Sequence, residues 1–167
     1  MPLLDNEELE INRLKILADY LFGTGAGEAL LSEGEVRIEY SKSTGRVRHV
    51  FVNGKRVLSF RPSDGTLVLT IEGARRLLKA IPPPRLRVVI KDEAIDFVKK
   101  GRSVFAKHVL VADSGIRPGM EVIVVDKHDS LVAIGRAVLS GEEMLIFNRG
   151  VAVKVRQGVA NEKNKSP

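Results

Sequence analysis

The chain opens with hydrophobic residues at three- and four-residue spacing, which is the pattern of an amphipathic helix. The spacing predicts a helix over residues 6–22, with an apolar stripe made of Ile11, Leu14, Leu17, Ala18 and Leu21. The glycine-rich segment 22–27 follows this helix rather than a strand, and no Gly-Lys-Ser/Thr comes after it. A turn into a short second helix ending at Leu31 is therefore favoured over a phosphate-binding loop.

Hydrophobic and polar residues then alternate, as in strands with one buried face. Strands are predicted at residues 36–40, 47–52 and 56–60, and Asn53-Gly54 is a strong hairpin signal, so the three form a meander. A short strand at 66–69 and a helix from the capping residue Thr70 to Ala80 follow. Basic residues at the polar positions could contact a nucleic-acid backbone, although resistance to aggregation is the favoured explanation. These residues are Arg46, Arg48, Lys55, Arg56 and Arg61.

Three consecutive prolines, Pro82-Pro83-Pro84, mark the best domain boundary, because they can neither continue a helix nor join a central strand. Residues 1–84 are predicted to form a small α+β domain with an antiparallel sheet. Residues 85–158 form the second domain, and the polar residues 159–167 are expected to be a disordered tail.

The second domain begins with a predicted strand at 86–90 and a helix capped by Asp92. Its inward positions are expected to be Ala94, Ile95, Phe97 and Val98. The carboxylates of Asp92, Glu93 and Asp96 match the helix dipole and are not interpreted as catalytic. Short strands then dominate, and they predict a small closed or half-closed barrel in which Gly135 marks a bend or a close backbone approach. They lie at residues 104–105, 109–111, 121–125, 131–139 and 151–155.

Positive charge gathers where this helix is predicted to end. Lys99 and Lys100 precede Gly101, a helix stop in the left-handed conformation, and Arg102 and Lys107 follow closely. A solvated helix end and a phosphate-binding corner both fit this pattern, and the local sequence leaves the two interpretations open.

Composition narrows the classes of protein. Hydrophobic residues make up 44% and the formal net charge is +6; residues 85–158 carry 13 Lys and Arg against 9 Asp and Glu. The surplus favours an anionic partner. Cysteine is absent and His49, His108 and His128 lie far apart, so neither a metal nor a cofactor is expected. No apolar run approaches the roughly 18 residues of a membrane span and no signal segment is recognised, so a cytoplasmic protein without membrane contact is expected.

Four segments of the second half resemble the successive motifs of a PUA domain. PUA domains are compact RNA-binding pseudo-barrels found in pseudouridine synthases and archaeosine transglycosylases. The order and spacing of the motifs make the resemblance specific over residues 85–158. The segments are 101–106, 116–125, 133–137 and 150–156.

Segments 22–30, 43–50 and 61–65 of the first half resemble the accessory domain that precedes PUA in archaeal tRNA-guanine (archaeosine) transglycosylase. The resemblance covers none of that enzyme's catalytic barrel, and the zinc-binding cysteines have no counterpart here. It therefore implies a protein that is not an enzyme.

The resemblance implies a non-catalytic RNA-binding protein, accessory to RNA modification or ribosome assembly, whose partner is tRNA or another structured RNA with a single-stranded end. An RNA-binding subunit acting in trans with a separate transglycosylase catalytic chain is the alternative. Phe105 is interpreted as a core residue more readily than as a base-stacking one. The motif positions that carry over as RNA-binding are Lys99, Lys100, Gly101, Arg102, Ser103, Val104, Phe105, Lys107, Lys154 and Arg156.

Overall fold

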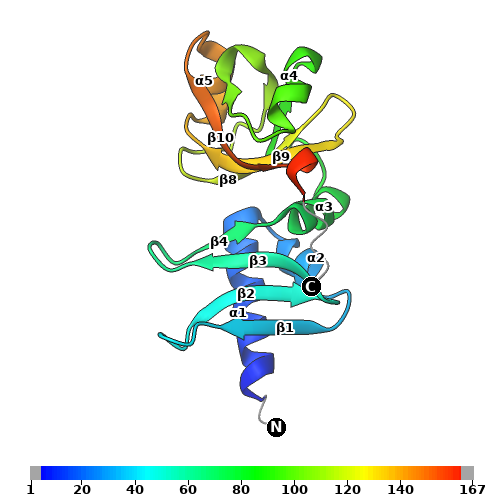
Figure 1. The fold of residues 1–167 in the computed structure, drawn as a ribbon, viewed down its shortest axis with the longest axis vertical. Coiled ribbons are helices and arrows are strands. Elements are labelled where there is room, and N and C mark those ends of the chain that lie inside the picture. The colour runs from blue at the N-terminus through cyan, green and yellow to red at the C-terminus, as the bar shows by residue number, and fades with distance from the viewer. Residues whose placement is uncertain (1–4, 163–167) are drawn as a thin grey trace. The chain divides into compact units, whose positions relative to one another are not determined.

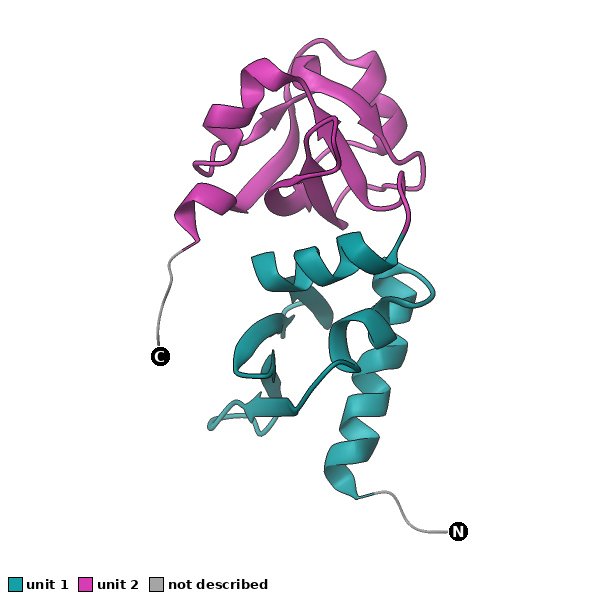
Figure 2. Cartoon of the chain, turned by 90° about the vertical axis from the view of Figure 1, so that its right-hand side faces the viewer, with its two compact units in different colours: residues 1–81 teal, residues 82–167 magenta. Residues whose placement is uncertain are grey.

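The structure, a computed structural model, describes residues 5–162. The chain divides into two compact units, residues 1–81 and residues 82–167 (Figure 2). Each unit has its own sheet and its own buried core, so each is described by itself.

The first unit begins with α1 (Asn6–Phe22), as the spacing predicted. The side chain of Asp5 caps this helix by accepting a hydrogen bond of 2.8 Å from the backbone N–H of Glu8. The short helix α2 (Ala26–Leu31) packs closely on α1, because Gly27 lies where a Cβ would overlap the backbone of Lys15. The glycine-rich segment is thus a turn between two helices, as predicted.

Four antiparallel strands form the sheet of this unit in the order β1-β2-β3-β4, so the predicted meander gains β4 at its edge (Figure 1). The strands are β1 (Val36–Tyr40), β2 (Val47–Val52), β3 (Lys55–Arg61) and β4 (Thr66–Leu69). Helix α3 (Ile71–Ala80) follows, and the Thr70 hydroxyl caps it by accepting a bond of 3.0 Å from the N–H of Gly73. Alternation buries one face of the sheet, including Val50, Leu58 and Leu69.

The second unit is a mixed six-stranded sheet that curls into a nearly closed pseudo-barrel, which confirms the predicted fold class. Its strand order is β6-β10-β9-β8-β5-β7, and only β5 and β8 run parallel. In chain order its elements are β5 (Arg87–Ile90), α4 (Asp92–Val98), β6 (Val104–Phe105), the 3-10 helix η1 (Ala106–His108), β7 (Val109–Ala112), β8 (Glu121–Val125), β9 (Leu131–Ala137), α5 (Gly141–Ile146), β10 (Val151–Gly158) and the 3-10 helix η2 (Val159–Asn161).

Strands β9 and β10 approach closely at Gly135. A Cβ at this position would overlap the backbone carbonyl of Lys154 on the neighbouring strand β10. The predicted close backbone approach is therefore confirmed, and it coincides with a register irregularity between Val155 and Gln157.

Several local predictions are wrong. Asp92 is the first residue of α4, and the N-cap residue is Lys91. The Asp92 carboxylate forms an ion pair of 3.0 Å with Lys127 instead. Phe97 does not face inward but is 62% exposed. The predicted strand 131–139 ends at Ala137, because the chain then turns into α5, a helix that was not predicted.

The predicted disordered tail begins with η2, which occupies residues 159–161. The remainder of that predicted tail, residues 163–167, lies outside the described residues.

Arg87 is a buried charge that the sequence pattern did not single out. Its side chain is 2% exposed and donates two hydrogen bonds of 3.0 Å to the carboxylate of Asp129. A third bond of 3.0 Å runs to the carbonyl of Arg85. A guanidinium can remain buried only when its donors are satisfied in this way.

Within residues 5–162, no helix is both long enough and apolar enough to cross a membrane. The same residues contain no group of three or more His, Asp and Glu side chains placed to hold a metal ion.

Candidate nucleic-acid interface

The basic corner of the second unit is built on the end of α4. Gly101 has a φ of 101°, the left-handed conformation expected of a glycine that stops a helix. Lys99 forms an ion pair of 3.0 Å with Asp96 one turn earlier. The hydrogen bond from Lys99 and its positive charge lower the pKa of the Asp96 carboxyl. Lys99 therefore already has an anionic partner within the protein.

The C-terminal segment packs against this helix end. The N–H of Ala160 donates a bond of 2.9 Å to the carbonyl of Lys99, and the side-chain amide of Asn161 donates to the carbonyl of Lys100. Gly158 has no room for a Cβ, which would overlap the carbonyl of Lys99. A Cβ on Gly101 would lie 3.0 Å from the Asn161 amide. One side of the Gly101 backbone is thus covered by the C-terminal segment.

Pairing between β6 and β10 brings predicted RNA-binding residues of these two strands close together. Val151 lies opposite Phe105 and Val153 lies opposite Val104, so Lys154 follows directly on the strand beside β6. Val104 is fully buried, backbone included, so it offers no surface to a ligand. Phe105 is 45% exposed, with its ring edge-on to His108 at 6.4 Å between centroids. Phe105 therefore offers surface to a ligand and is not purely a core residue.

Four of the predicted cations are exposed: Lys100, Arg102, Lys107 and Lys154. Within the described part of the chain, none of them forms an ion pair. Their charges are therefore available to an anionic ligand. Ser103, between Arg102 and Val104, is half-buried.

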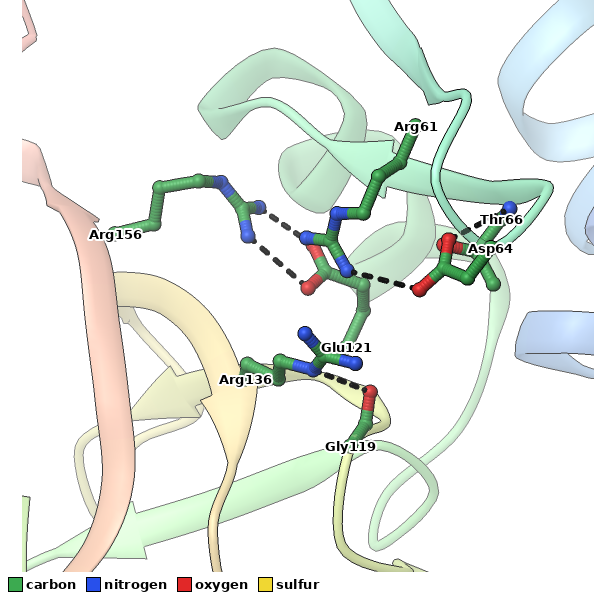
Figure 3. A network of polar contacts seen from close by, with 7 residues as sticks. All are labelled: Arg61, Asp64, Thr66, Gly119, Glu121, Arg136 and Arg156. Atoms are coloured by element: carbon green, nitrogen blue, oxygen red, sulfur yellow. Dashed lines mark hydrogen bonds and ion pairs between the residues drawn. The ribbon is translucent and has the colours of Figure 1, made fainter.

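Arg156 differs from these cations because it has a strong internal partner. Its guanidinium donates two hydrogen bonds, of 3.0 and 2.6 Å, to the carboxylate of Glu121 (Figure 3). The Glu121 side chain is only 6% exposed, whereas that of Arg156 is 33% exposed. Such a bidentate pair holds β10 against β8 across β9, so Arg156 has a structural role whether or not it contacts RNA.

Two side chains near this surface were missed. Arg136 lies opposite Lys154 in the β9–β10 ladder, and its Nε donates a bond of 3.0 Å to the carbonyl of Gly119. The alternation of residues 133–137 could have placed Arg136 on the outer face. Phe97 is the second, and its carbonyl accepts bonds of 3.2 Å from the N–H groups of Lys100 and Arg102. The Phe97 backbone thus holds the turn that carries Lys100 and Arg102, and the side chain of Phe97 is exposed.

Each unit matches a known domain family. Residues 12–84 match the patch-forming domain C2 of tRNA-guanine transglycosylase, and residues 86–159 match the PUA domain.

Similar proteins are archaeal tRNA-guanine(15) transglycosylases. The protein of Thermococcus kodakarensis is 48% identical over 143 residues, which are 86% of this chain and 24% of that protein. That of Pyrococcus furiosus is 49% identical over 147 residues, 88% of this chain and 24% of that protein. The chain thus spans about a quarter of the length of these curated relatives. The match includes the C2 and PUA parts of the transglycosylase and does not include the catalytic domain.

Solved structures share the fold over nearly the whole chain. A hypothetical protein from Pyrococcus horikoshii has a TM-score of 0.73 at 27% identity, and the match covers 92% of both chains. A conserved PUA domain protein from Thermoplasma acidophilum has a TM-score of 0.66 at 18% identity, covering 95% of this chain and 93% of that one. The second likeness shows the fold alone.

We predict that Arg156→Ala lowers the free energy of unfolding by about 1–3 kcal/mol, because it removes two charge-assisted hydrogen bonds to the nearly buried Glu121 carboxylate. Lys154→Ala, two residues away and exposed, should change it by less than about 0.5 kcal/mol. Urea denaturation followed by circular dichroism measures both. Equal stability of the two variants would show that the Arg156–Glu121 pair does not stabilise the unit.

Proposed function

Because its two units belong to the families of domain C2 of tRNA-guanine transglycosylase and of the PUA domain, we propose that this chain is a non-catalytic RNA-binding protein. Its ligand is tRNA or another structured RNA with a single-stranded end, in the setting of tRNA modification. The names of the relatives support the tRNA setting.

The main support for this proposal is that some cations near the end of α4 are paired with carboxylates and others are not. Lys100, Arg102, Lys107 and Lys154 are exposed and have no ion pair within residues 5–162, while neighbouring cations are held by carboxylates. Exposed lysines and arginines that meet a phosphate backbone release its counterions, which supplies affinity without sequence selectivity.

Aromatic rings complete the surface. Phe97 and Phe105, 62% and 45% exposed, flank the turn that carries Lys100 and Arg102 in the sequence. Unpaired bases stack on such rings while nearby cations hold the phosphates, which is how proteins take up single-stranded RNA. The combination fits a single-stranded end attached to a helix better than a duplex alone. Gly101 and Ser103, which are half-buried, would approach the same strand.

The lack of a match to the catalytic domain supports a non-catalytic role. The matched parts are the two accessory domains, and both are accounted for by the two units. A catalytic step would have to come from another chain or another part of the protein.

We predict that Lys100→Ala, Arg102→Ala and Lys154→Ala each weaken binding to a tRNA transcript and lower the slope of log K against log salt by about one, because each removes one phosphate contact. Fluorescence anisotropy over a salt series measures both quantities. Lys127→Ala is the matched control, since Lys127 pairs with Asp92 at the opposite end of α4. If all three variants keep the slope and affinity of the control, the site is wrongly assigned.

A second candidate is a subunit that binds RNA for a separate transglycosylase catalytic chain. A specific observation favours it: Leu9, Ile16 and Tyr20 share one face of α1 and are 39%, 71% and 84% exposed. Apolar side chains left exposed at helical spacing suit a partner protein that covers them.

For this candidate, we predict that Ile16→Ser combined with Tyr20→Ser weakens the complex with a co-expressed transglycosylase catalytic chain by at least about tenfold, because two apolar contacts are lost. The measurement is the dissociation constant by calorimetry after size-exclusion chromatography. Leu145→Ser in the second unit, another exposed apolar position, should leave it unchanged. A complex that never forms, or one insensitive to the α1 variant, removes the candidate.

A further inference from the structure

The first unit contains a pocket that neither the RNA surface of the second unit nor the family match explains. It has a volume of about 330 Å³ and lies between α1 and the turn that joins β1 to β2. This volume is at the lower end of the range of about 300–1,000 Å³ that is usual for ligand sites. It suits one flat heterocycle with part of a sugar better than a large cofactor.

Most of the side chains that line the pocket are apolar or aromatic. Leu14 and Leu17 of α1 line it together with Val47 and Phe60 of the sheet. The ring of Tyr40 is 46% exposed at the end of β1 and forms part of the lining. A partly exposed aromatic ring among aliphatic side chains is a surface on which a base can stack.

The polar lining consists of one carboxylate and two guanidinium groups. Glu10 faces the pocket with 27% of its side chain exposed. Burial, followed by the charges of Glu10 and Glu7, raises the pKa of Tyr40, which agrees with the placement of Glu10 close to that ring. Arg13 lies 3.7 Å from Glu10 and is 75% exposed, so the two form only a loose surface pair that a ligand can open.

The remaining cation stands on the turn. Arg46 is exposed and follows Gly45, whose φ of 71° turns the chain at the edge of the pocket. Two backbone bonds fix the turn, one from the N–H of Ser41 to the carbonyl of Arg46 and one from the N–H of Gly45 to the carbonyl of Ser41. The arginine is thus presented from a defined backbone.

We propose that this pocket binds one guanine base of a single-stranded RNA segment, with the Glu10 carboxylate accepting hydrogen bonds from N1–H and the 2-amino group. The base stacks against Tyr40, and Arg46 and Arg13 bind the adjoining phosphates. The assignment to RNA rests on the proposed function; the preference for guanine rests on the pocket alone.

Guanine is selected because of the chemistry of the carboxylate. A carboxylate only accepts hydrogen bonds, and it can accept two from adjacent donors. Guanine presents two neighbouring donors on its Watson–Crick edge. Adenine and cytosine place a ring acceptor beside a single amino group, and uracil flanks its one N–H with two carbonyls, so each would meet the carboxylate with a repelling atom.

The test uses two single-stranded oligouridines that differ only in a central guanosine or adenosine. Because bonds to a charged acceptor are lost with adenine, the guanosine form should bind about tenfold or more tightly by anisotropy. An inosine form, which keeps N1–H but lacks the 2-amino group, should fall between the two. Equal affinity for guanosine and adenosine overturns the proposal.

Variants connect this preference to the pocket. Glu10→Gln should reduce the ratio of guanosine to adenosine affinity to about one, whereas Glu8→Gln, on the same helix but outside the pocket, should keep it. Tyr40→Ala should weaken binding of both oligonucleotides by about tenfold through lost stacking. Thermal melting establishes that each variant is folded. A guanosine preference that survives in folded Glu10→Gln, or an unchanged affinity of folded Tyr40→Ala for both oligonucleotides, contradicts the site.

Free GMP and AMP form the second arm of the experiment. GMP should be preferred over AMP but should bind about tenfold or more weakly than the oligonucleotide, which carries additional phosphates. GMP that binds as tightly as the oligonucleotide would overturn the assignment to RNA and identify a free nucleotide as the ligand.

The two proposals fail separately. If tRNA binding depends on Lys100 and Lys154 but guanosine is not preferred, the pocket assignment is wrong and the proposed function stands. If guanosine is preferred but the Lys100→Ala and Lys154→Ala variants bind tRNA normally, the surface of the second unit is wrongly assigned and the pocket stands.

Discussion

The contact between the C-terminal segment and the end of α4 is the constraint on which the proposed RNA surface depends. Gly158 lacks a Cβ where one would overlap the carbonyl of Lys99, and Ala160 and Asn161 donate hydrogen bonds to the carbonyls of Lys99 and Lys100. Because β10 leads directly into this segment, the same contact holds the strand that carries Lys154 next to the turn that carries Lys100 and Arg102. A helix end that would otherwise be solvated becomes one wall of a defined surface.

A second feature of this unit is the separation of structural cations from exposed ones. Arg87 is buried on Asp129, Arg156 is bonded to Glu121, and Lys99 is paired with Asp96. The pairs of Arg87 and Arg156 each include a nearly buried side chain and stabilise the barrel, whereas the Lys99–Asp96 pair lies at the surface and contributes little to stability. The exposed lysines and arginines have no such structural role. A positive surface of this kind can bind phosphates without loss of the fold.

Much of the fold could be predicted from the sequence, because it depends on local periodicity. The spacing in residues 6–22 and the alternation in residues 36–60 correspond to α1 and to the first three strands. The roles predicted for two glycines are also found in the structure. Gly101 adopts a positive φ, and Gly135 lies against the neighbouring strand. The local predictions that were wrong can be explained by neighbouring residues in the sequence. The capping box of Ser140 and Glu143 was a signal for α5, but the apolar residues that follow it hid the helix among strands.

The parts that could not be predicted depend on residues distant in the chain. Arg87 and Asp129 are 42 residues apart, and Arg156 and Glu121 are 35 apart, so no pattern along the sequence joins them. Phe97 was expected inside because its spacing fits an apolar stripe, yet the short helix α4 buries only Ala94 and Val98. The pocket of the first unit is formed by α1, the turn after β1 and strand β3, which only the fold brings together.

The most direct test of the account compares the binding of intact tRNA with that of the same tRNA lacking its single-stranded 3′ end. If Phe97, Phe105 and the surrounding cations hold unpaired nucleotides, removal of the end should weaken binding by about tenfold or more, since stacking and phosphate contacts are lost together. Equal affinity for the two RNAs, measured at the same salt concentration, would contradict the central claim that this surface takes up a single-stranded end.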